Sequence, residues 1–183
     1  MTHVGNALLD TTILLEKARI VSGMHVADFG CGKTGHVVFP VSFGVGEEGV
    51  VYAVDILQDA LISIDKRAKS QAMHNIHTIR SDLERVGKTC IPENSLDVVY
   101  IVNVLSIAHN RHAYLEEAQR LLKNKGRIIV ADWVPSELPI APEKGVCLAF
   151  DNIEQWARMS GFGIQEKFSL GKYHEGMVLY RNI

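Results

Sequence analysis

The stretch from His25 to Gly35, HVADFGCGKTG, constrains this chain more than any other part of it. A short apolar run leads into Asp28, and closely spaced glycines follow at Gly30, Gly32 and Gly35. A strand that ends in such glycines and opens into a helix lets a ligand approach bare backbone. The unpaired N–H groups at the start of that helix favour a polar or anionic group. The stretch therefore predicts a ligand-binding turn between a strand and a helix.

A second apolar run, at residues 50–54, ends in an acid, Asp55. At the end of the strand that follows a glycine-rich turn, a carboxylate can accept hydrogen bonds from both hydroxyls of a ribose. Two successive strand ends, one glycine-rich and one acidic, therefore predict a nucleoside site.

The length and composition are those of a single globular domain, 1–183, with 47% hydrophobic and 22% charged residues. The net charge of −2 disfavours a nucleic-acid substrate, although a local basic patch would still allow one. No apolar run approaches the roughly 20 residues that span a bilayer, and the N-terminus lacks the pattern of a signal peptide. Cys31, Cys90 and Cys147 show no metal-ligand spacing, which predicts a cytoplasmic protein with no structural metal.

Strand and helix patterns alternate along most of the chain. Strands are expected at 26–29, 50–54, 76–80, 96–102 and 127–132, and helices at 5–20, 35–43, 58–73 and 111–123. This alternation predicts a parallel, doubly wound α/β sheet with helices on both faces. The tail differs: a loop at 133–148 and a helix at 151–161 precede a closing hairpin of strands at 163–170 and 176–181.

Two local expectations follow from the helix patterns. Gly126 is expected to end the helix at 111–123 in a left-handed cap. Arg67 is expected to lie, with its charged neighbours, on a solvated helix face.

Five segments resemble, in order and spacing, the class I S-adenosylmethionine-dependent methyltransferases. They are DFGCG at 28–32, Asp55, SDL at 81–83, SLDVV at 95–99 and LLKNKG at 121–126. The phrases IPENSLDVV and LLKNKGRIIVADW are most similar to the small ubiquinone/menaquinone C-methyltransferase branch. The resemblance implies a Rossmann-like sheet of seven strands in the order 3-2-1-4-5-7-6, mostly parallel, with the last strand antiparallel.

The resemblance also implies S-adenosylmethionine as the cofactor, with S-adenosylhomocysteine as the product. It assigns the methionine moiety to Asp28 and the backbone of the following turn, and the ribose to Asp55. On the adenine side, Ile56 packs against the ring, Asp82 hydrogen-bonds the exocyclic amine and Leu83 contributes its backbone. The residues expected to bind the cofactor are Asp28, Phe29, Gly30, Cys31, Gly32, Lys33, Asp55, Ile56, Asp82, Leu83 and Asn103.

The glycine turn departs from the family's usual pattern at its third glycine. Thr34 stands where that glycine is expected, and Gly35 follows it, with Lys33 beside the site. Lys33 either pairs with the carboxylate of the cofactor or projects into water. The contacts of His36 are equally open.

Two other functions fit the same residues. The three glycines with Asp55 also match the dinucleotide fingerprint, so a nicotinamide-dependent oxidoreductase is the rival interpretation. Asp28 argues against it, because dinucleotide sites normally keep that position apolar beneath the pyrophosphate. A protein that binds the cofactor without catalysis is the third interpretation, distinguished by tight cofactor binding without turnover.

The residues after the fourth strand bear on the methyl acceptor. Asn103 is expected to line the methyl-transfer cavity, but Val104-Leu105-Ser106 does not continue it into an Asn-Pro-Pro-aromatic motif for adenine or glutamine N-methylation. A Pro-Cys pair of the cytosine C5 enzymes is also missing. These observations favour a small-molecule acceptor. His109 is the candidate general base, and a monomer or homodimer is expected.

Overall fold

The computed structural model describes residues 9–135 and 147–181. Its elements in chain order are α2 (Thr11–Ala18), β1 (His25–Phe29), α3 (Val38–Val45), β2 (Val50–Asp55), α4 (Gln58–Ser70), β3 (Ile76–Arg80), β4 (Leu96–Val102), α5 (Arg111–Leu121), β5 (Leu122–Trp133), α6 (Phe150–Met159), β6 (Phe162–Ser169) and β7 (His174–Arg181). The predicted alternation of strands and helices is confirmed over the described residues, with boundaries shifted by a few residues. The start of the helix expected at 5–20 and most of the loop expected at 133–148 lie outside the described residues. Among the described residues, no helix is both long and apolar enough to cross a membrane.

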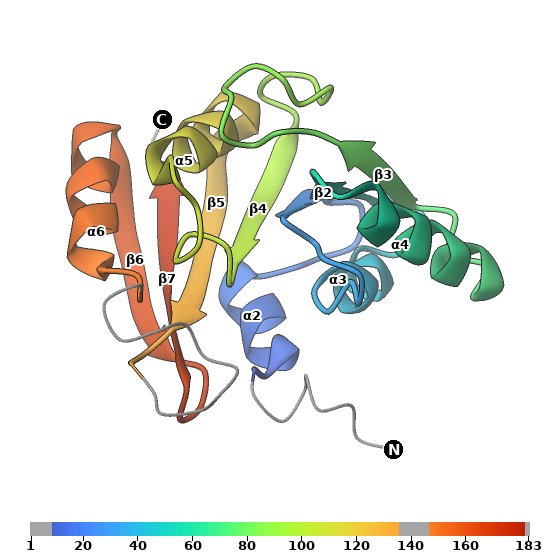
Figure 1. Ribbon diagram of the computed structural model, residues 1–183, viewed down its shortest axis with the longest axis horizontal. Helices are drawn as coiled ribbons and strands as arrows, with labels where there is room; N and C mark the ends of the chain where they lie inside the picture. The colour runs from blue at the N-terminus through green and yellow to red at the C-terminus, as the bar shows by residue number, and fades with distance from the viewer. Residues whose placement is uncertain (1–8, 136–146, 182–183) are drawn as a thin grey trace.

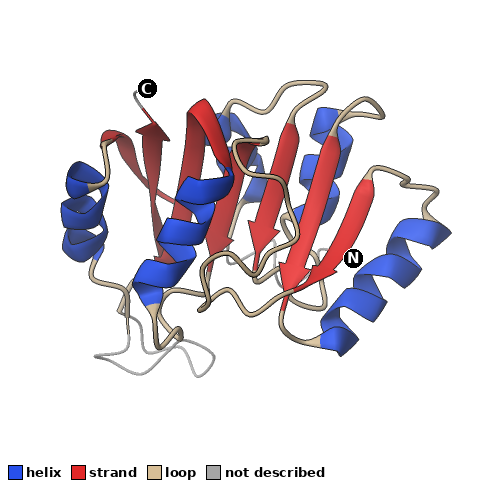
Figure 2. Cartoon of the chain, turned by 90° about the horizontal axis from the view of Figure 1, so that it is seen from above, coloured by secondary structure: helices blue, strands red, loops and turns tan. Residues whose placement is uncertain are grey.

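The strands form one sheet in the order β3-β2-β1-β4-β5-β7-β6 (Figure 1), as the resemblance implies. Strands β1 to β5 pair in parallel, whereas β7 is antiparallel to both β5 and β6. Helices cover both faces of the sheet (Figure 2). The predicted fold class is therefore confirmed.

The sheet is buried on both faces because successive side chains of its central strands enter two different cores. In β4, Val98 and Tyr100 pack into the core under α2, α3 and α4, while Val99 and Ile101 pack into the core under α5 and α6. This is why β4 reads as a nearly continuous apolar run.

The connection between α5 and β5 differs from the sequence expectation. The helix ends at Leu121, and β5 begins at once with Leu122, which pairs with Leu96 before the register shifts. Lys125, rather than Gly126, takes the left-handed conformation, with φ 64°. Gly126 serves close packing instead, since a Cβ there would lie 2.5 Å from Leu122 Cγ. The prediction of a glycine cap was therefore wrong.

Residues 81–95, between β3 and β4, contain no helix and are held by an ion pair whose carboxylate is buried. Glu117 on α5 is fully buried and accepts hydrogen bonds from the N–H groups of Gly87 and Thr89 at 2.6 and 3.1 Å. Arg120 donates to both oxygens of Glu117. Burial alone would raise the pKa of Glu117, but the hydrogen bonds from Arg120, Gly87 and Thr89 lower it to about 2. The pair therefore anchors this connection to α5.

Candidate functional site

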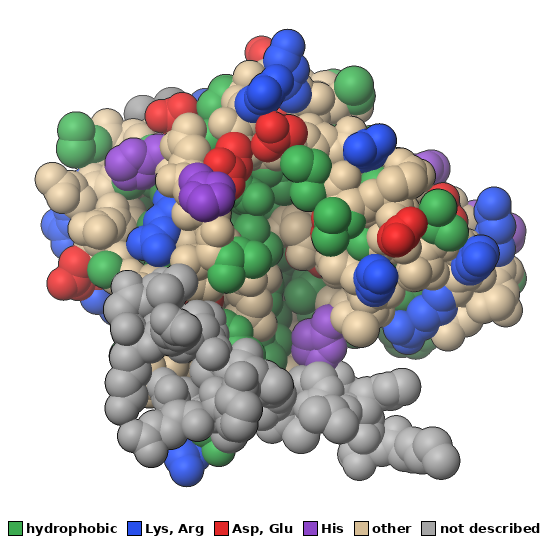
Figure 3. All heavy atoms as spheres, viewed as in Figure 1, with side chains coloured by type: hydrophobic (Ala, Val, Ile, Leu, Met, Phe, Trp, Pro, Cys, Tyr) green, Lys and Arg blue, Asp and Glu red, His purple; other side chains and the backbone are tan. Residues whose placement is uncertain are grey.

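The predicted site residues lie at the point where the order of the strands across the sheet changes direction. Strand β1 lies between β2 and β4, and ligands of open α/β sheets bind at the carboxyl ends of strands at such a position. Asp28 lies near the end of β1, Asp55 ends β2, and Asn103 follows β4. Figure 3 shows that this face of the molecule is hollowed in its middle, with hydrophobic side chains on the floor of the hollow.

The three glycines of the turn have different structural roles. All three take positive φ, with values of 79° at Gly30, 59° at Gly32 and 54° at Gly35. A Cβ on Gly30 would lie 2.5 Å from Val104 Cγ2, and one on Gly35 would lie 2.5 Å from Ile64 Cδ1. A Cβ on Gly32 would meet nothing within 4 Å. Two of the glycines therefore allow close packing, while Gly32 exposes backbone toward open space.

Asp55 holds the glycine turn in place. Its Oδ2 accepts a hydrogen bond from the Gly32 N–H at 2.9 Å, and its Oδ1 accepts one from the Leu57 N–H at 2.9 Å. Each carboxylate oxygen can accept a further hydrogen bond. The carboxylate is therefore already oriented, with capacity left for two ligand hydroxyls.

Asp28 is a buried carboxyl group with only 3% of its surface exposed. Burial, together with the charge of Asp55, raises its pKa to about 7. No hydrogen bond contributes to this shift. A buried carboxylate without such support is stabilised by a cation, so Asp28 is suited to a positively charged ligand group.

Phe29 and Cys31 have buried side chains, so only their backbone is available for the role predicted for them. The Phe29 side chain is fully buried in the core, and the Cys31 N–H donates to the Val54 carbonyl at 3.1 Å. Burial and the nearby Asp28 and Asp55 carboxylates raise the pKa of the Cys31 thiol, so the thiol is neutral and unreactive.

The basic residues beside the turn behave differently from one another. Lys33 is exposed, and no described residue forms an ion pair with it. Arg67 of α4 donates to the Thr34 carbonyl at 3.0 Å and stacks on Phe39, with 3.8 Å between its guanidinium carbon and the ring centroid. Arg67 is exposed, as expected for a solvated helix face, and it makes these two contacts in addition. His36 Nε2 lies 3.1 Å from the Leu9 carbonyl oxygen and ties the turn to the residues before α2.

The residues predicted for adenine form one side of the site. Ile56 is 54% exposed beside Asp55, which leaves an apolar surface available to a ring. Asp82 is partly exposed, and its Oδ1 accepts a hydrogen bond from the Glu84 N–H at 3.1 Å. Leu83 is buried, so only its backbone is available. The positions agree with the predicted roles, which remain predictions.

The other side of the site is the turn after β4. Asn103 has φ 57°, a strained conformation that clusters at functional sites, and its N–H donates to the Ala131 carbonyl at 2.9 Å. Its Oδ1 is buried and has no hydrogen-bond partner. His109 is exposed, and its N–H donates to Glu84 Oε1 at 3.0 Å. Within the part of the chain that the structure describes, neither the Asn103 Oδ1 nor the His109 ring has a hydrogen-bond partner.

Sequence reasoning missed Asp132, near the end of β5. It is fully buried, and its Oδ2 accepts a hydrogen bond from the Ser106 N–H at 3.0 Å. Burial raises the pKa of Asp132, although hydrogen bonds from Trp133 and Ser106 and the charge of Arg111 oppose the shift. The signal was available, because an acid ends this strand as Asp28 and Asp55 end theirs. Among the described residues, no group of three or more His, Cys, Asp or Glu side chains could hold a metal ion.

Comparison with known proteins settles the family. A family model described as "Methyltransferase domain" matches residues 20–174. The chain belongs to this methyltransferase family. The match includes the glycine turn, both strand-end acids and the turn after β4.

Two curated proteins are also similar to parts of the chain. The chain is 33% identical over 86 residues to aklanonic acid methyltransferase of Streptomyces sp. strain C5, which covers 47% of this chain and 37% of that protein. It is 27% identical over 121 residues to the ubiquinone/menaquinone biosynthesis C-methyltransferase of Shewanella frigidimarina, which covers 65% of this chain and 46% of that protein. The chain thus spans less than half the length of these curated relatives.

Solved structures confirm the fold. A SAM-dependent methyltransferase from Aquifex aeolicus superposes with a TM-score of 0.84 at 21% identity, covering 96% of this chain and 92% of that one. The [4+2]-cyclase SpnF superposes with a TM-score of 0.78 at 16% identity, covering 94% and 80% of the two chains. The family match confirms the prediction of S-adenosylmethionine as the cofactor.

Proposed function

We propose that this chain is an S-adenosylmethionine-dependent methyltransferase that acts on a small-molecule acceptor. The observation that carries the proposal is the pair of carboxylates, Asp28 and Asp55, beside the glycine turn. S-adenosylmethionine brings an ammonium and a sulfonium, which two carboxylates attract. The pyrophosphate of a nicotinamide cofactor is negatively charged and would be repelled, which disfavours the oxidoreductase.

Different residues of the site bind different parts of the cofactor. Asp28 pairs with the ammonium group, and that partner lowers the pKa of the buried carboxyl again. The remaining lone pairs of Asp55 accept the ribose hydroxyls, and the backbone at Gly32 lies against the methionine chain. Ile56 and Asp82 hold the adenine. The cofactor supplies the methyl group through its sulfonium, so the protein needs mainly to align the acceptor with it.

The acceptor side is built from the turn after β4. Asn103 offers a buried oxygen without a partner, which suits an acceptor bearing a hydroxyl or amine. His109 is proposed as the general base for an acceptor that keeps its proton near neutral pH. The names of both relatives refer to small molecules, aklanonic acid and ubiquinone or menaquinone, which supports an acceptor of this class.

Catalysis itself needs a separate test, because the fold does not imply it. A [4+2]-cyclase shares this fold. A protein that binds the cofactor without catalysis, or one that catalyses a different reaction, is therefore a possible outcome of the experiment described next. We further propose that residues 1–183 act as one methyltransferase domain, as a monomer or homodimer in the cytoplasm. Free Cys31, Cys90 and Cys147 support a reducing compartment.

Calorimetric titration with S-adenosylhomocysteine and with NADH tests the proposal. Wild type is expected to bind the homocysteine compound with micromolar affinity and NADH not at all. Asp55→Ala is expected to lose that binding, while Asp59→Ala, an exposed acid on α4, serves as the matched control. Binding of NADH alone would overturn the proposal. A screen of hydroxyl- and amine-bearing acceptors with labelled cofactor then separates an enzyme from a binding protein.

A further inference from the structure

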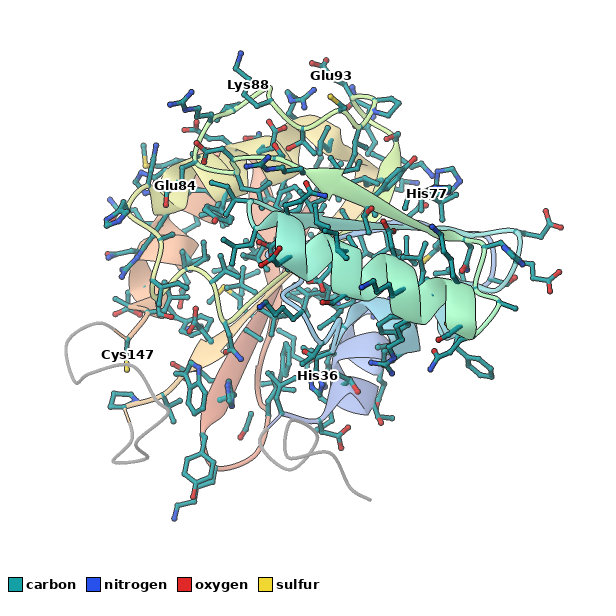
Figure 4. All side chains as sticks on the ribbon, turned by 45° about the vertical axis from the view of Figure 1, so that its right-hand side comes forward. His36, His77, Glu84, Lys88, Glu93 and Cys147 are labelled. Atoms are coloured by element: carbon teal, nitrogen blue, oxygen red, sulfur yellow. The ribbon has the colours of Figure 1, made fainter. Side chains whose placement is uncertain are left out.

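Glu84 links two loops that are distant in the sequence. Its Oε1 accepts a hydrogen bond from the His109 N–H at 3.0 Å, and its Oε2 accepts one from the Asn110 N–H at 3.3 Å. Asn110 is the N-cap of α5, and its side chain accepts a hydrogen bond from the Ala113 N–H. Figure 4 shows Glu84 beside α5. One carboxylate thus binds both N–H groups that immediately precede this helix.

Glu84 is also fixed to the side of the site predicted for adenine. Its own N–H donates to Asp82 Oδ1 at 3.1 Å, and Leu83 between them is buried in the core. Asp82 also pairs with Arg85, at 3.2 Å between Nε and Oδ2. Asp82 and Glu84 are therefore joined by a single hydrogen-bonded turn of backbone.

We propose that Glu84 is a positioning residue that couples the two sides of the site. Its carboxylate holds the start of α5, with His109, against the loop that carries Asp82. Binding of the cofactor's adenine at Asp82 would stabilise this loop and, through Glu84, the backbone that places His109 on the acceptor side. The proposal rests on the proposed function and adds to it a path from cofactor binding to the acceptor side.

The charges around Tyr114 agree with this arrangement. Tyr114 lies near the start of α5 and is partly buried. Burial, followed by the charges of Glu84, Asp55 and Asp82, raises the pKa of its phenol to about 12. These charges agree with the hydrogen bonds that hold Glu84 against the start of α5.

The strength of the link comes from charge. Hydrogen bonds from backbone N–H groups to an ionised carboxylate are about twice as strong as those between neutral groups. Glu84→Gln keeps one acceptor oxygen but removes the charge, whereas Glu84→Ala removes both acceptors. The two substitutions therefore weaken the hydrogen bonds from Glu84 to different degrees without changing Asp82 or His109.

Hydrogen–deuterium exchange at residues 107–114 tests the coupling. In wild type, saturating S-adenosylhomocysteine is expected to slow exchange of the His109 and Asn110 amides about tenfold. In Glu84→Ala without ligand, these amides are expected to exchange about tenfold faster than in wild type. Ligand binding is then expected to give the variant little of the protection seen in wild type. Glu84→Gln is expected to fall between them. Glu93→Ala, an acid on the same loop that pairs with Arg120 instead, is expected to behave as wild type.

The outcomes separate the coupling from the proposed function. If wild type does not bind S-adenosylhomocysteine, the proposed function fails before the coupling is tested, and the proposal on Glu84 fails with it. If wild type binds but the amides at 109–110 are not protected, the coupling is overturned and the function stands. Equal ligand-induced protection in wild type and Glu84→Ala would assign Glu84 a merely structural role and also overturn the coupling.

Discussion

Asp28 and Asp55 lie near the carboxyl ends of adjacent parallel strands, and the charge of Asp55 adds to burial in raising the pKa of Asp28 to about 7. The two carboxylates have different surroundings. Asp55 accepts two backbone N–H groups, whereas no hydrogen bond offsets the burial of Asp28. The pair therefore contains one carboxylate that is already stabilised and one that needs a cation.

The stability of the ligand-free protein is expected to reflect this difference. A carboxyl whose pKa is higher in the folded than in the unfolded state stabilises the protein at low pH, and that contribution is lost as pH rises. For Asp28 this loss falls between its ordinary pKa of 3.8 and its raised pKa of about 7. Asp28→Asn does not ionise, so its free energy of unfolding relative to wild type should rise by up to about 4 kcal/mol across this window.

Urea unfolding of both proteins at intervals from pH 4 to pH 8 measures this difference. Asp59→Asn, at an exposed position on α4, should show no such trend. A constant difference between wild type and Asp28→Asn at all pH values would show that Asp28 titrates alike in the folded and unfolded states.

Substitutions at the glycines of the turn are expected to distinguish a loss of packing, seen in stability, from a loss of ligand affinity. Gly30→Ala combines a positive φ with a Cβ 2.5 Å from Val104, and should destabilise the protein by about 3 kcal/mol. Gly32→Ala carries only the conformational strain, and should cost about 1 kcal/mol. Because its new Cβ enters open space beside the cofactor position, Gly32→Ala should still weaken binding of S-adenosylhomocysteine about tenfold.

Thermal unfolding and calorimetry on the same samples check both effects. Gly171→Ala is the control, because Gly171 has φ 91° and open space around it but lies in the β6–β7 turn. Its stability should fall by about 1 kcal/mol with ligand affinity unchanged. Unchanged affinity in Gly32→Ala would remove this glycine from the binding site.

Glu117 is expected to make the protein sensitive to acid. Its pKa is lowered to about 2 in the folded state, so its contribution to stability is present above its ordinary pKa of 4.5 and is lost as pH falls toward 2. The shift corresponds to about 3 kcal/mol. Glu117→Gln should therefore be less stable than wild type at pH 7, and the gap should narrow between pH 4.5 and pH 2.

Chemical unfolding across that range provides the measurement. Glu93→Gln, which removes the more exposed partner of Arg120, should cost less than 1 kcal/mol. A gap between wild type and Glu117→Gln that does not change with pH would contradict the lowered pKa.

The sequence was sufficient for the alternation of strands and helices because their periodicity is a local signal, whereas the order of the seven strands was predicted from the family resemblance. Strands β3 and β4 have the predicted boundaries, and the closing hairpin confirms the reversed strand. At Gly126 the prediction failed because glycine also serves close approach of side chains, here to Leu122, and a sequence does not show which need applies.

The positions of Asp28 and Asp55 were predictable because they follow from where two strands end, and the structure has them there, while their roles stay predictions. The site was not predictable where it depends on contacts between distant loops. Arg67 looks solvated in the helix pattern but reaches the Thr34 carbonyl, and Glu84 meets His109 only once the sheet has formed. These contacts join residues that are far apart in sequence and leave no periodic signal.

The pH dependence of S-adenosylhomocysteine affinity tests the central claim most directly, because it reports whether the ligand's ammonium pairs with Asp28. Calorimetry from pH 5.5 to pH 8.5 should show wild-type affinity rising by up to about tenfold per pH unit below about 7 and levelling off above it. Asp28→Asn should bind more weakly at pH 8 and show no such rise. A wild-type affinity that is flat across this range, or a rise that persists in Asp28→Asn, would contradict the account.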